Sequence, residues 1–146
     1  MARLPKDLDT YTGCDCDQAI GLDPLAVGFL SRKFKFQTGK PPAGFLEKLR
    51  SFCHPDVTVC HTHGKRKSPF DNKHIELDVN GTPTTLGGAE IRVIGTEDIF
   101  AAPDLVYHYV VDHNYLPPQE FIDAVLNGPQ PNSAEFRALI KTLRTF

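Results

Sequence analysis

The stretch AEIRVIGTEDIFAAPDLVYHYVVDH, residues 89–113, carries the clearest structural pattern in the chain. Its first part has two apolar arms, residues 89–95 and 99–102, joined by a polar bend at residues 96–98, which predicts a β-hairpin. The second part begins with Pro103 and an early acidic residue, as helix N-termini do, and continues with apolar residues at helical spacing. We therefore expect a hairpin that is followed directly by a helix.

The segments before this stretch predict a helix and a second hairpin. Residues 42–53 begin with proline and carry phenylalanine and leucine at helical spacing, which favours a helix. Residues 74–79 alternate as a strand does, and the following Asn80-Gly81 pair is typical of a type I′ turn. The second hairpin arm, residues 82–86, contains Pro83, which limits it to an edge strand or a loop.

Two further helices are expected at the C-terminal end. Residues 117–127 are followed by Gly128 and Pro129, which stop a helix, and residues 133–144 begin with Ser133 as an N-cap. Toward the N-terminus, residues 23–31 favour a short helix or strand, residues 33–38 alternate as a strand would, and residues 56–60 predict a brief strand. The expected fold class is α+β, with small antiparallel hairpins packed against three to four helices and a zinc-finger-like metal site.

Bulk composition predicts one ordinary domain that spans residues 1–146. A chain of 146 residues with 40% hydrophobic content is long enough to bury one core. The formal net charge of -2 gives no overall positive field to attract nucleic acid or anionic lipid. The first residues lack the apolar segment of a signal peptide, and no run approaches the length of a membrane span, so we expect a cytoplasmic protein that does not enter a membrane.

Cys60, His63, His108 and His113 have the spacing of zinc ligands. Cys60 and His63 form a C-x2-H pair, which a tight turn can aim at one point, and His108 and His113 form an H-x4-H pair on the expected helix. Histidines five positions apart differ by roughly 140° around a helix axis, so the last turn must distort for both to reach one ion. The 44 residues between the pairs require the hairpins to bring the two halves together. One thiolate and three imidazoles would close a structural zinc site.

Other metal sites are compatible with the same residues. His61 and His63 would share one face of a strand, and with His74, Asp56 or Asp71 as third ligand they would form an open, catalytic zinc site of a small hydrolase. A second metal site would use Cys14, Cys16, Cys53 and His54, although adjacent residues rarely converge on one ion. Because no export signal is evident, we expect the cysteines to be thiols or metal ligands instead of disulfides.

Two basic clusters suggest surfaces for partners. Arg32, Lys33 and Lys35 alternate with Phe34 and Phe36, which either places the phenylalanines in the core or offers stacking platforms to a single strand of nucleic acid. Residues 65–67 form a basic loop whose ordinary environment is solvent.

Residues 87–128, GGAEIRVIGTEDIFAAPDLVYHYVVDHNYLPPQEFIDAVLNG, resemble the C-terminal part of an uncharacterised family of small bacterial zinc-binding domains. The shared features are the AEIRV strand, the AAP helix start and the HYV-x2-H-x-Y-x-PP segment. In that family a C-x2-C pair precedes the hairpin, and Cys60 and His63 occupy the matching places here. The resemblance implies a zinc-binding domain and implies no particular activity.

The sequence therefore favours a zinc-stabilised domain that binds a protein partner, and nucleic acid is the weaker alternative. No glycine-rich phosphate loop and no G-x-S-x-G motif appear in the chain. Whether the protein is an enzyme stays open, and the zinc-dependent hydrolase that uses His61 and His63 is the alternative function.

Overall fold

The computed structural model describes residues 4–13, 23–62, 64–131 and 133–138. In chain order, the strands are β1 (Leu25–Ala26), β2 (Glu76–Val79), β3 (Thr82–Thr85), β4 (Glu90–Ile94) and β5 (Ile99–Pro103). The helices are α2 (Phe45–Phe52), α3 (Val106–His113) and α4 (Gln119–Asn127), and residues 134–138 are also helical. This mixture of small sheets and helices confirms the α+β class.

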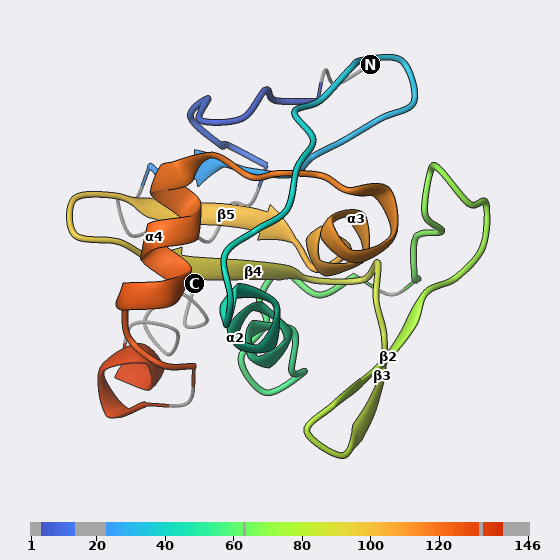
Figure 1. The fold of residues 1–146 in the computed structure, drawn as a ribbon. Helices are drawn as coiled ribbons and strands as arrows, with labels where there is room; N and C mark the ends of the chain where they lie inside the picture. Colours follow the sequence, from blue (N-terminus) through green and yellow to red (C-terminus); the bar gives the residue numbers. More distant parts are fainter. Residues whose placement is uncertain (1–3, 14–22, 63, 132, 139–146) are drawn as a thin grey trace.

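The predicted hairpin forms as β4–β5, and it lies at the centre of the fold (Figure 1). β4 and β5 pair antiparallel, and β1 adds to the far side of β5 in parallel, giving the strand order β1-β5-β4. α4 crosses the hairpin, and α2 packs against α3, α4 and β4. The core between these elements contains Phe45 and Leu49 from α2 and Phe121 from α4, all with 0% of their surface exposed.

The second hairpin is also confirmed. β2 and β3 pair antiparallel in a sheet of their own, and the turn residues Asn80 and Gly81 both have positive φ angles, 50° and 90°. Two residues with φ above zero define a type I′ turn, which is why the Asn-Gly pair predicted it. Pro83 lies in β3, and a two-stranded sheet has only edge strands, so its missing N–H is tolerated there.

Three local predictions were wrong. Residues 33–38 form no strand beyond an isolated bridge at Thr38, because this segment pairs with the chain around Tyr115 and not with a sheet. Residues 56–60 contribute only a bridge from Val59 to Glu90. α3 begins at Val106 and not at Pro103, because Pro103 still pairs with Glu90 as the last residue of β5.

Among the described residues, no helix has both the length and the apolar character needed to cross a membrane.

Candidate metal centre

Asp71, His108 and His113 bring three potential ligand atoms within 4.8 Å of one another. The Oδ2 atom of Asp71 lies 2.6 Å from Nε2 of His108 and 2.8 Å from Nε2 of His113. His108 is buried, with 3% of its surface exposed, whereas the side chains of Asp71 and His113 are 27% and 22% exposed. The centre therefore has one buried ligand and two that solvent reaches.

A tight turn in the loop of residues 68–73 directs Asp71 toward α3. Ser68 is 1% exposed, its N–H donates to the Lys73 carbonyl, and its carbonyl accepts from the Asn72 N–H. The Ser68 hydroxyl donates to Asp71 Oδ2 over 3.0 Å and accepts from the Phe70 N–H over 3.3 Å. These bonds fix the Asp71 carboxylate, so that it does not depend on the histidines alone for its position.

Helix α3 supplies both histidines, His108 from its first turn and His113 as its last residue. The helix ends at His113, and Asn114 follows in the left-handed conformation with φ of 57°, which terminates a helix as glycine commonly does. The rings of His108 and His113 lie 5.0 Å apart and are nearly perpendicular. Phe70 packs against the His113 ring at 4.7 Å and the Tyr109 ring at 5.4 Å, which holds the 68–73 loop on the helix.

Hydrogen bonds from His113, His108 and Ser68 hold the pKa of the Asp71 carboxyl well below its ordinary value. His108 also faces a second carboxylate, because its Nδ1 lies 2.7 Å from Oδ2 of Asp112, one turn further along α3. Both ring nitrogens of His108 therefore face carboxylate oxygens. A metal ion would bind Nε2 through its lone pair, in place of a proton there.

The donor set suits a divalent transition metal. Two imidazole nitrogens and one carboxylate oxygen are ligands that Zn²⁺ accepts, and three protein ligands leave a further coordination position. In many metal sites a carboxylate accepts a hydrogen bond from the non-ligating nitrogen of a histidine ligand and orients its ring. Asp112 is placed to do this for Nδ1 of His108. The arrangement is thus chemically able to hold a metal through Asp71, His108 and His113.

Two members of the predicted ligand set belong to this cluster, His108 and His113. His63 lies outside the described residues. Cys60 is disulfide-bonded, so it would have to be reduced before it could act as a thiolate ligand. Its sulfur accepts a hydrogen bond from Arg92 over 3.6 Å, and Cys60 is not part of the three-residue cluster. The four-ligand set therefore stays a prediction, whereas the expectation of a free thiol was wrong for Cys60.

The residues of the alternative sites are dispersed where the structure describes them. His61 contacts the Thr58 hydroxyl through Nε2 at 2.8 Å and is not a member of the cluster. Cys53 is a free, buried thiol that donates to the carbonyls of Leu49 and Asp104, and burial raises its pKa. His54 contacts Thr82. Cys14 and Cys16 lie outside the described residues.

Sequence reasoning named Asp71 only as a third ligand for the alternative site and missed its place beside His108 and His113. The local signal was the sequence Ser68-Pro69-Phe70-Asp71, since a serine hydroxyl commonly closes a turn onto residues that follow it. That signal predicts a turn but not the helix on which the turn packs.

Fold and site together define a small α+β domain with a candidate metal centre at the end of one helix. The chain belongs to the family described as Domain of unknown function (DUF7919), whose model matches residues 5–126, a range that includes all three cluster residues. No curated protein and no solved structure matches the chain. The family match agrees with the resemblance to an uncharacterised family, and it assigns no activity.

Proposed function

We propose that this protein is a zinc-stabilised binding domain in which Asp71, His108 and His113 ligate one Zn²⁺. The observation that carries the proposal is the convergence of both Nε2 atoms on one Asp71 oxygen, while Asp112 holds the opposite nitrogen of His108. Structural zinc sites contribute directly to folding free energy, because the unfolded chain lacks the preformed site. The ion would fix the 68–73 loop to α3.

A role in binding a protein partner is proposed for the stabilised domain. Supporting it are the position of the cluster, where an ion would tie the 68–73 loop to α3, and the lack of a catalytic motif in the sequence. Cys60 and His63 remain proposed additional ligands. They would close the coordination sphere if the Cys60 disulfide is reduced, and their contribution is tested separately from that of the three clustered residues.

The decisive experiment compares the effect of zinc on the thermal unfolding of matched variants. A ligand that binds only the folded state stabilises it by about 2.7 kcal/mol at 100 times its Kd, which raises the Tm of a domain of this size by several degrees. Zinc should raise the Tm of the wild type and of His61→Ala, a matched histidine variant outside the cluster. It should leave the Tm of Asp71→Asn and His113→Ala unchanged.

Metal content completes this test. Protein purified without chelators should contain one zinc per chain by mass spectrometry, and Asp71→Asn should contain none. An equal zinc-induced rise in Tm for the wild type and His113→Ala would show that the cluster is a hydrogen-bond network without a metal. Cys60→Ser and His63→Ala then show whether zinc affinity depends on these residues.

One observation favours a second candidate, a metal-dependent hydrolase. The cluster has three protein ligands, two of which are partly exposed, and such a set leaves room for a metal-bound water. X-ray absorption of the zinc-loaded protein separates the two functions. A coordination sphere with a water ligand supports the hydrolase, and a sphere filled by protein atoms supports the structural role.

A further inference from the structure

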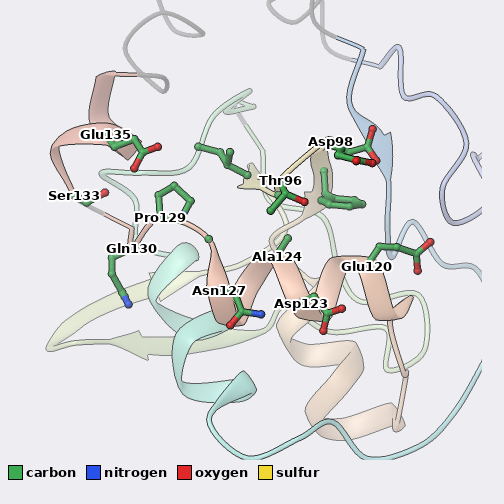
Figure 2. A pocket seen from close by; sticks show the side chains of 15 residues that line it. Thr96, Asp98, Glu120, Asp123, Ala124, Asn127, Pro129, Gln130, Ser133 and Glu135 are labelled. Carbon is green, nitrogen blue, oxygen red and sulfur yellow. The ribbon is translucent and has the colours of Figure 1, made fainter.

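A cleft of about 750 Å³ lies between the β4–β5 turn, α4 and residues 128–130, 133 and 135, and none of its lining residues belongs to the candidate metal centre (Figure 2). In Figure 2, Thr96 and Asp98 line one wall, and Glu120 and Asp123 of α4 line the facing wall. Phe100 and Ala124, which are 2% and 6% exposed, contribute apolar surface to it. The cleft thus combines polar walls with an apolar base.

Among the described residues that line this cleft, every charged one is acidic. These residues are Glu97, Asp98, Glu120, Asp123 and Glu135, and all are exposed. A concave surface with charge of one sign concentrates the field and attracts ligands of the opposite sign. The matching ligand is a segment that presents cations around an apolar side chain.

Residues 32–35, which we name the 32–35 loop, have this character. Phe34 is 66% exposed, more than the other exposed large hydrophobic residues of the described chain, Leu4 and Val111 at 42% and 44%. Arg32, Lys33 and Lys35 flank it and are exposed. An aromatic side chain surrounded by cations on a loop is typical of an interface anchor and not of a core residue.

The fold holds the 32–35 loop in its exposed position. Phe36 packs against the rings of Phe70 and Tyr115 at 5.7 and 5.8 Å, and the Gln37 carbonyl accepts the Leu116 N–H. In Figure 1 the segment around this loop lies at the upper right, whereas the β4–β5 turn that borders the cleft lies at the far left. The loop therefore cannot fill the cleft of its own molecule.

We propose that the acidic cleft binds the 32–35 loop of a second copy of this chain, with Phe34 against the apolar base and the three cations against the carboxylates. The contact joins two different surfaces, so it is head-to-tail and propagates beyond a dimer unless rotation closes a ring. A single loop in a cleft buries less than the roughly 1,200 Å² of a standard interface, which makes the association weak and salt-dependent.

Sedimentation velocity over a concentration series up to about 1 mM, with zinc held constant, tests this contact, because weak interfaces need such concentrations. The wild type should associate, and Phe34→Ser and Asp123→Arg should each weaken association about tenfold or more, as loss of an interface anchor does. Glu76→Arg makes the same charge change on β2, outside the cleft, and should associate as the wild type does.

Mixing the two defective variants gives the sharpest result. Phe34→Ser retains an intact cleft, and Asp123→Arg retains an intact loop, so an equimolar mixture should form a 1:1 complex that cannot grow further. Circular dichroism and Tm should show that both variants fold, and Glu120→Arg replaces Asp123→Arg if that chain does not. A monomeric wild type overturns the proposal, even if a synthetic peptide of residues 30–38 binds the cleft. Failure of the mixture to form a complex also overturns it.

Discussion

Two polar clusters of the molecule differ in whether their side chains could hold a metal ion. The first consists of Asp71, His108 and His113; the second joins Glu90, Arg92 and Tyr11 across the sheet. In the second, Arg92 is fully buried, donates to Glu90 over 2.9 Å and lies over the Tyr11 ring at 5.7 Å. The Tyr11 hydroxyl donates to the other oxygen of Glu90.

The difference lies in the donors. A guanidinium is permanently protonated and offers no lone pair to a metal ion. Arg92 can therefore only donate hydrogen bonds and form ion pairs. An imidazole that loses its proton offers a lone pair, and the His108 cluster can therefore exchange protons for a metal ion. The two clusters thus differ in whether they could bind a metal, and substitutions should affect them differently.

The largest effect is expected at Arg92. Replacing Arg92 with Leu leaves the partly buried Glu90 carboxylate without its cation, and breaking a buried pair in this way costs about 3 to 5 kcal/mol. Urea unfolding measures the loss. The double variant Arg92→Leu with Glu90→Gln should recover part of it, because no uncompensated charge remains. A loss below about 1 kcal/mol, the range of surface pairs, would contradict a buried ion pair here.

The second largest effect on the free energy of unfolding is expected at Asp104. This residue extends the comparison to a buried carboxyl that has no strong cation partner. Burial raises the pKa of Asp104 to about 6, and its Oδ1 accepts the Gly87 N–H over 2.7 Å. The folded chain holds this proton more tightly than the unfolded chain, whose Asp pKa is about 4. The free energy of unfolding should therefore fall as pH rises from about 4 to about 6, by about 3 kcal/mol, and then level off.

Urea unfolding between pH 4 and 7 measures this slope for the wild type and Asp104→Asn. The variant cannot titrate, so its stability should change less across this range, whatever its absolute value. Asp98→Asn, an exposed carboxyl on the β4–β5 turn, is the matched control and should retain the slope of the wild type. Equal slopes for all three proteins would place the pKa of Asp104 near its ordinary value.

Local patterns in the sequence predicted most of the elements because their physical causes are local. The alternating apolar arms around residues 96–98 gave the β4–β5 hairpin, and Asn80-Gly81 gave the second turn. The alternation in residues 33–38 predicted a strand that does not form. Alternation indicates which side chains would share a face, but not whether a neighbouring strand is available for pairing. There Phe36 packs on Tyr115 instead, and Phe34 faces solvent.

The candidate site could be predicted only in part. His108 and His113 lie on one short helix, so their spacing alone suggested that they bind a common metal ion. Asp71 lies 37 positions before His108, and its approach depends on Phe70 packing against α3, which no local pattern encodes. The disulfide at Cys60 was likewise not predicted. The reducing environment of the cytoplasm favours free thiols in general, but it does not indicate which sulfur atoms the fold brings together.

Asp112 gives the smallest effect on folding and the finest test of the difference between the two clusters. Its side chain is 57% exposed, so Asp112→Asn should change the free energy of unfolding of the metal-free protein by less than about 0.5 kcal/mol. If His108 ligates zinc, loss of the carboxylate behind Nδ1 should weaken zinc binding about 10- to 100-fold. Competition with a chromophoric chelator measures this affinity.

Asp123→Asn makes the same change on α4, away from the centre, and should bind zinc as the wild type does. Unchanged affinity in Asp112→Asn would mean that Asp112 only forms a surface ion pair with His108 and does not tune a ligand.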